Sequence, residues 1–157
     1  MPTSRSSVPS ITPDERALLR TSHVGAREIA TLGGGRLHRR VAEAIPRSRC
    51  DELVALAVFQ TLGSVGRETA RDLVRLGFRS IADLKKQDPR ELYDRMCRLT
   101  RTRQDPCVED AFRCAIAQAR DPKLPAHLRK WWSWTPVRGK PMSAKPTALR
   151  PRRSAKR

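Results

Sequence analysis

The segment Leu62-Gly63-Ser64-Val65-Gly66 restricts the fold most, because it places two glycines within five residues between two helical patterns. Before it, residues 53–59 are all apolar. The acidic pair in front of this run and the alanines inside it favour a helix over a strand. After the segment, apolar residues recur on one side of a second helix, which Gly77 ends. The sequence therefore predicts two consecutive helices joined by a tight turn.

Three further helices are predicted after this pair, because each begins with a pattern typical of a helix N-terminus. Residues 80–83 form a capping box, and Asp88-Pro89 and Asp105-Pro106 each place a capping aspartate before a proline. The last helix has the most regular amphipathic spacing in the chain. The predicted helices span residues 51–60, 67–76, 80–87, 89–99 and 106–119, which gives an all-α fold with a compact five-helix core.

The residues before this core are expected to be less regular. Residues 1–12 are predicted to be disordered and residues 13–48 to be a short helical N-terminal extension. In the extension, a capping box at residues 12–15 starts one helix, and Gly33-Gly34-Gly35 is expected to be a flexible break. A second helix, residues 36–45, carries a thin apolar stripe and ends at Pro46. We expect these pieces to pack loosely, if at all, on the core.

Positive charge is concentrated near the C-terminus. The chain has 33 basic and 16 acidic residues, and residues 121–157 hold 11 of the basic and one of the acidic ones. Residues 51–120 are almost balanced, with 13 basic and 11 acidic residues. We therefore predict a disordered basic tail at residues 135–157 that attracts polyanions in a salt-dependent way. Nucleic acid is the expected polyanion, and a membrane is not expected because the tail lacks an apolar face.

No apolar run is long enough to span a membrane, and no export signal precedes the first helix. We therefore expect a cytoplasmic protein whose four cysteines are reduced thiols. The spacing Cys97-x9-Cys107-x6-Cys114 lacks the close pairing that zinc favours, and the three histidines are scattered. No nucleophile–base pair is evident either. We expect no enzyme activity, no cofactor and no metal.

The two helices around the glycine turn resemble the helix-hairpin-helix motif. In that motif the turn lets backbone N–H groups approach a phosphate, and the second helix directs its N-terminal N–H groups and dipole at the same anion. Such contacts do not read base identity. Five helices match a tandem helix-hairpin-helix unit, with a second, glycine-free hairpin at residues 100–104. An ordinary turn between antiparallel helices is the alternative for the first hairpin, and a solvated loop is an equally open one for the second.

This sequence departs from the motif at two positions. Ser64 stands where a glycine often takes a positive φ, and Glu68 stands where a lysine is common. Arg67 and Arg71 can compensate for Glu68. We expect Gly66 to occupy a conformation or a close contact that a side chain would spoil, and Arg67 to point outward. The predicted nucleic-acid-binding residues are Gly63, Ser64, Val65, Gly66, Arg67, Arg71, Arg101 and Arg103.

The region from residue 50 to 134 also resembles a family of small bacterial helix-hairpin-helix proteins, the pathogenicity-locus or mitomycin-resistance family. The matching stretches are residues 62–84, Asp88-Pro89-x-Glu91-Leu92-Tyr93 with Cys97, residues 105–113, and Trp131-Trp132-x-Trp134. The resemblance implies a DNA-binding function. We expect Trp131 and Trp132 to help seal the core, with base stacking as the alternative.

The sequence is compatible with two functions of different classes. The first is a DNA-binding module that contacts the phosphate backbone through the hairpin and the basic tail without sequence preference. The second is a protein-interaction adaptor that uses the hairpin surface to dock a protein partner, which the balanced core charge and Glu68 favour. A DNA glycosylase, which also uses this motif, is disfavoured because the chain is short and lacks the expected catalytic residue after the hairpin.

Overall fold

A computed structural model describes residues 10–146, and all the regular secondary structure in that range is helical. The predicted all-α class is confirmed. The α-helices are α1 (Pro13–Thr21), α2 (Ala26–Leu32), α3 (Gly34–Arg40), α4 (Arg47–Phe59), α5 (Arg67–Arg75), α6 (Pro89–Thr100) and α7 (Cys107–Arg120). Three short 3-10 helices are η1 (Ile81–Leu84), η2 (Ala126–Arg129) and η3 (Trp131–Val137). The disorder predicted for residues 1–9 and 147–157 lies outside the described residues.

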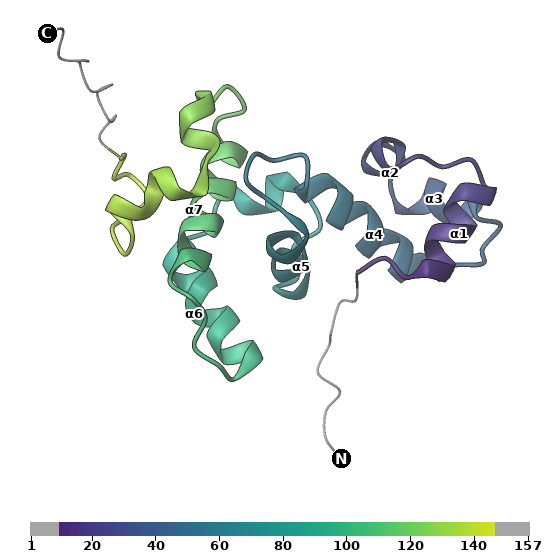
Figure 1. The fold of residues 1–157 in the computed structure, drawn as a ribbon, viewed down its shortest axis with the longest axis horizontal. Coiled ribbons are helices and arrows are strands. Elements are labelled where there is room, and N and C mark those ends of the chain that lie inside the picture. Colours follow the sequence, from purple (N-terminus) through teal and green to yellow (C-terminus); the bar gives the residue numbers. More distant parts are fainter. Residues whose placement is uncertain (1–9, 147–157) are drawn as a thin grey trace, which may run out of the picture.

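Helix α4 connects the two ends of the molecule. Figure 1 shows α1–α3 at one end, α6 and α7 toward the other, and α4 running between them with α5 beside it. Apolar side chains occur on several sides of α4, and Leu53, Leu56 and Phe59 are buried. A helix that is apolar all round must be covered on more than one side. Neighbours therefore pack on α4 from both parts of the chain, α2 and α3 from one and α5 from the other.

The N-terminal helices pack tightly on α4, so the expectation of loose packing is wrong. Leu37, Val41 and Ile45 are almost completely buried and belong to the same hydrophobic core as the apolar residues of α4. The predicted glycine break is confined to Gly33, which has a positive φ and separates α2 from α3, because Gly34 and Gly35 already belong to α3. A Cβ on Gly34 would lie 3.1 Å from the Asp51 Cα, a backbone atom of α4, so the glycine lets α3 approach α4 closely.

Helix starts in the core follow the predicted caps in most cases. Ser80 and Asp83 form the predicted capping box, although the element that follows is the short helix η1 and ends before residue 87. Asp88 caps α6 by accepting the N–H of Glu91. Asp105 accepts the N–H of Cys107 at the start of α7, with Pro106 between them. The start of α4 differs from prediction, because Pro46 directly precedes this helix at its N-cap position.

The first part of the predicted disordered tail is ordered, so the boundary at residue 135 is wrong. Residues 131–142, the C-terminal segment, lie along α7, with Trp134 and Val137 buried against Cys114 and Ala117. The main polar partners of the C-terminal segment are three charged side chains of α7 that are almost inaccessible to solvent, Glu109, Asp110 and Arg113. The charge and proline content of this segment predicted a disordered tail, because composition carries no information about buried partners elsewhere in the chain.

Three polar connections hold the C-terminal segment on α7. The buried Asp110 carboxylate accepts hydrogen bonds from the Thr135 hydroxyl (2.9 Å) and from the Arg138 guanidinium, whose Nε lies at 3.0 Å. The Glu109 carboxylate accepts the N–H of Gly139 at 2.7 Å. The fully buried Arg113 donates to the carbonyls of Lys140 and Pro141, the latter at 3.2 Å. Every buried charge in this cluster therefore has partners of opposite charge or polarity.

Candidate nucleic-acid interface

The α4–α5 turn, residues 60–66, is bound to α7 through its first glycine. The Gly63 N–H donates to Gln118 Oε1 at 2.8 Å, and Gln118 Nε2 donates to the Gly63 carbonyl at 2.9 Å. A Cβ on Gly63 would lie 2.8 Å from Arg129 Cβ and 2.9 Å from the Arg129 carbonyl oxygen. Gly63 thus permits close packing of the turn against α7 and η2, and both of its backbone polar groups are already paired.

The remaining turn residues lead into α5. Ser64 has φ +59°, the left-handed conformation for which a glycine is often found at this position. Val65 is buried and donates its N–H to the Leu62 carbonyl. Gly66 is the N-cap of α5 with φ −86°, and an added Cβ would have no other atom within 4 Å. The expectation that a side chain at position 66 would disrupt the backbone conformation or a close contact is therefore wrong.

The N-terminus of α5 carries positive charge beside uncapped N–H groups. Within the described part of the chain, no side chain caps this end of the helix. Arg67 is exposed, which confirms the predicted outward orientation, and it begins the helix. Glu68 is also exposed and forms an ion pair with Arg71 at 3.3 Å. The acidic residue that departs from the motif is thus neutralised by the arginine one turn later.

The α6–α7 loop, residues 101–106, is held by hydrogen bonds of its own. Arg101 takes the left-handed conformation, with φ +53°, at the C-cap of α6. Tyr93 donates its hydroxyl to the Gln104 carbonyl at 2.6 Å, and the Gln104 side chain donates to Thr100 Oγ1 at 2.8 Å. The loop is therefore shaped without a glycine, and it fixes the backbone positions from which Arg101 and Arg103 extend.

Arg101 and Arg103 line a cleft of about 730 Å³, the arginine cleft. Three more arginines line it, Arg90 and Arg98 from α6 and Arg138 from the C-terminal segment. Sequence reasoning missed these three. Arg90 and Arg98 lie eight residues apart on α6, close to one helical face, which is a detectable pattern. Arg138 has no such local signal, because its position depends on the buried Asp110.

The charges around the arginine cleft do not cancel. Arg90 forms ion pairs with Asp94 at 3.4 Å and with the buried Glu109 at 3.3 Å. Arg138 is paired with Asp110. The other three arginines of the cleft form no ion pair within residues 10–146, and those three are Arg98, Arg101 and Arg103. The cleft therefore has three guanidinium groups that an anionic ligand can neutralise.

The structure does not bring the two predicted hairpins together. Gly63 contacts Gln118, near the C-terminal end of α7, whereas Arg101 and Arg103 precede its N-terminal end. Gln118 lies eleven positions after Cys107, which corresponds to about 16 Å along the helix axis. Any polyanion that contacts both hairpins must therefore extend over at least this length of α7.

Comparison with known proteins defines the family of this chain. The model of the pathogenicity locus family, Cdd1, matches residues 52–140, more than half of the chain. The chain belongs to the pathogenicity locus family. It is also 46% identical over 78 residues to a protein named mitomycin resistance protein McrB from Streptomyces lavendulae, an alignment that covers 50% of this chain and 70% of that protein. No solved structure gives a significant match.

The family region extends past the three tryptophans, and these differ in role. Trp134 is buried and donates its indole N–H to the Leu128 carbonyl at 2.8 Å. Trp132 is 54% exposed, with the Lys130 ammonium 5.6 Å from its ring centroid and Trp131 packed edge-on against it. The core-sealing role predicted for Trp131 and Trp132 fits Trp131, which is partly buried against the same cluster as Trp134, and it is wrong for Trp132.

The cysteines of this protein are mainly packing residues. Cys50 and Cys114 are buried, and burial raises the pKa of the Cys114 thiol to about 11. A hydrogen bond with Asp105, together with burial, raises the pKa of Cys107 to about 11 as well. Across residues 10–146, no cluster of histidine, cysteine and acidic side chains has the arrangement needed to hold a metal. The same range contains no helix that is both long and apolar enough to cross a membrane.

Proposed function

We propose that this protein binds nucleic acid without sequence preference, contacting phosphates through the arginine cleft and the N-terminus of α5. The observation that carries the proposal is the convergence of five arginines from three segments, with three of them unpaired within the described residues. Guanidinium groups are well suited to phosphate, because their planar donors can form paired hydrogen bonds with two oxygens. Phosphate contacts of this kind carry no base information, so the expected ligand is DNA of any sequence.

The proposal includes the helix-hairpin-helix interpretation of both helix pairs. In it, α4, the glycine turn and α5 form the first unit, and α6, the α6–α7 loop and α7 form a degenerate second unit. The left-handed Ser64 and the uncapped start of α5 support the first assignment. The left-handed Arg101 in a tight interhelical loop supports the second. The charge of residues 147–157, which include five basic residues, adds a salt-sensitive attraction for the same polyanion.

A charge-neutralising variant of the α6–α7 loop tests the main contact. The double variant Arg101→Gln with Arg103→Gln removes two unpaired charges and keeps a long, unbranched polar side chain at the left-handed position. The matched control is Arg36→Gln with Arg39→Gln, which removes two exposed charges from α3. We expect the loop variant to bind a fluorescent DNA duplex about ten-fold more weakly in anisotropy titrations. Its slope of log affinity against log salt should also fall by between about 1 and 2.

Equal losses in the loop variant and the control would contradict the proposal, because they would indicate attraction by net charge alone. The α5 contact is tested separately by Arg67→Glu, an exposed charge swap that should leave stability within about 0.5 kcal/mol. We expect it to weaken DNA binding both in the full chain and in a chain that ends at residue 146. If neither chain is affected, α5 contributes structure and not binding.

A protein-interaction adaptor is the second candidate. The observation that favours it is the pairing of both Gly63 backbone groups with Gln118, which leaves this glycine no free donor for phosphate. The exposed Trp132 also suits a protein interface, where tryptophan is enriched. If the full chain binds no DNA at low salt, the adaptor function becomes the better explanation of the exposed surface.

A further inference from the structure

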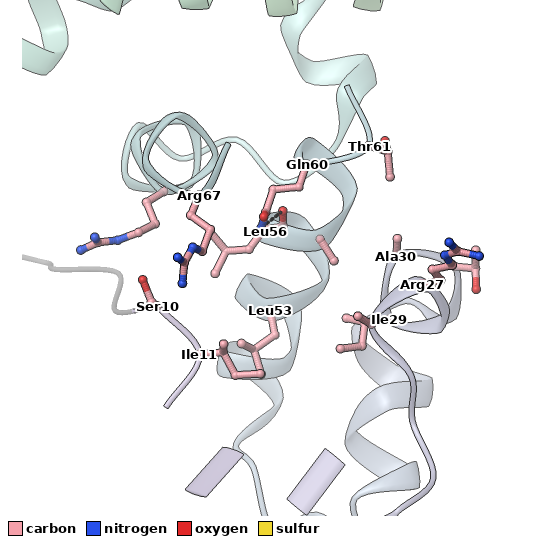
Figure 2. A pocket seen from close by; sticks show the side chains of 14 residues that line it. Ser10, Ile11, Arg27, Ile29, Ala30, Leu53, Leu56, Gln60, Thr61 and Arg67 are labelled. Atoms are coloured by element: carbon pink, nitrogen blue, oxygen red, sulfur yellow. Dashed lines mark hydrogen bonds between the residues drawn. The ribbon is translucent and has the colours of Figure 1, made fainter. Parts of the chain in front are cut away.

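A second cavity, of about 460 Å³, lies over α4 and is separate from the arginine cleft. Its floor consists of apolar side chains of α4, including Leu53, Leu56 and Ala57. Figure 2 shows Ile11 on one side of these residues and Ile29 with Ala30 of α2 on the other. A volume of this size lies within the range of about 300–1,000 Å³ that is usual for small-molecule sites.

Three of the four uncharged polar side chains that line this cavity donate to backbone carbonyls of the adjoining helix turns, and the fourth is Ser10. The Thr31 hydroxyl donates to the Glu28 carbonyl, and the Thr61 hydroxyl donates to the Val58 carbonyl at 2.6 Å. The Gln60 side chain donates to the Leu56 carbonyl at 3.1 Å. These side chains thus have few donors left for a ligand, and the polar contribution of the cavity comes mainly from its arginines.

All the charged side chains that line the cavity are arginines, Arg27 from α2 and Arg67 and Arg71 from α5. Arg67 and Arg27 stand on different sides of it (Figure 2). Arg67 forms no ion pair within the described residues, and Arg71, one turn further along α5, pairs with the exposed Glu68. The cavity therefore combines an apolar interior with an excess of positive charge at its edge.

We propose that this cavity binds a small amphipathic organic anion, a compound with a hydrocarbon body and one carboxylate, sulfonate or phosphate group. The hydrocarbon body would occupy the space over Leu53 and Leu56, where it is removed from water. The anionic group would lie at Arg67, whose guanidinium forms no ion pair within residues 10–146. A nucleobase fits less well, because the lining residues include no aromatic side chain on which it could stack.

The test uses the full chain and two defined probes. The fluorescent anion 8-anilinonaphthalene-1-sulfonate reports occupancy, and decanoate or decyltrimethylammonium is added to displace it. Decanoate and the ammonium compound share a ten-carbon chain and differ in the sign of their charge. We expect one probe to bind per chain and decanoate to displace it at least ten-fold more effectively than the cation does.

Two variants locate the site. Ala30→Trp places a large side chain in the cavity wall and should abolish probe binding. Arg67→Gln should weaken displacement by decanoate about ten-fold while the thermal melt of the protein stays unchanged. Arg39→Gln, an exposed arginine on α3, is the matched control and should have no effect. Failure of the wild-type chain to bind the probe overturns the proposal, as does equal displacement by the cation or unchanged binding in both variants. DNA affinity is measured separately, so the result does not depend on the nucleic-acid proposal.

Discussion

Substitution of the two turn glycines by alanine should change stability by very different amounts, and the difference follows from the packing of the turn. At Gly63, an added Cβ would lie within 3 Å of two Arg129 atoms, one of them a backbone oxygen that cannot rotate away. Relief of this contact requires the turn to move from α7, which costs about 1–3 kcal/mol as overpacking. The same movement weakens the two hydrogen bonds with Gln118, each worth about 0.5–1.5 kcal/mol. We therefore expect Gly63→Ala to destabilise the protein by about 2–4 kcal/mol.

At Gly66 the same substitution should be nearly neutral. Its φ of −86° and ψ of −171° are open to alanine, and no atom beyond the neighbouring residues lies within 4 Å of the new Cβ. Alanine is a poorer N-cap than glycine, which costs about 0.5 kcal/mol. Alanine also lowers the conformational entropy of the unfolded chain, which stabilises the folded state by a similar free energy. We expect Gly66→Ala to change the free energy of unfolding by less than about 0.5 kcal/mol.

Urea denaturation followed by far-ultraviolet circular dichroism measures both variants in one assay, since unfolding abolishes the helical signal. A comparison of the midpoints at unchanged slope gives the two stability changes. If Gly66→Ala is the more damaging variant, the packing argument for Gly63 is refuted, and the turn depends on the second glycine as the motif alone would suggest.

Four further outcomes follow from the structure. Trp132→Ala should leave the melting temperature almost unchanged because the side chain is 54% exposed, whereas Trp134→Ala should cost about 3–5 kcal/mol; equal effects in thermal melts would contradict this. Asp110→Ala should destabilise the protein by about 2 kcal/mol and make the chain near Arg138 sensitive to trypsin, because the buried carboxylate no longer holds the C-terminal segment. Burial raises the pKa of Asp72 from 3.8 to about 6, so the folded state binds this proton more tightly than the unfolded state does. The free energy of unfolding should therefore fall by an amount on the order of 2 kcal/mol as pH rises from about 4 to 6. Asp72→Asn should remove that fall in denaturation experiments measured across this pH range. Removal of residues 147–157 takes away five basic residues and should lower the salt slope of DNA binding by up to about 4, and an unchanged slope would show that these residues do not contact DNA.

Local signals in the sequence determined most of the helical architecture. Capping residues act over three or four positions, so the starts of η1 and α6 and the engagement of Asp105 at α7 were predictable from Ser80, Asp88 and Asp105. The glycine turn between α4 and α5 was likewise readable, since Ser64 takes the left-handed conformation expected for its place in the turn. The sequence also placed Arg67, Arg101 and Arg103 on the exposed surface, as candidate phosphate contacts.

Only the tertiary structure decided what these elements pack against, and three outcomes depended on it. Gly34 begins a helix because α3 approaches α4 closely, although three glycines in a row are locally typical of a break. Residues 135–142 are ordered because the buried charges of α7 are satisfied by them, which a count of charges cannot reveal. The arginine cleft joins α6, the following loop and Arg138, which stands forty residues after Arg98. Local sequence reports backbone preferences over a few residues, whereas burial and ion pairing depend on contacts between residues that are distant in the chain.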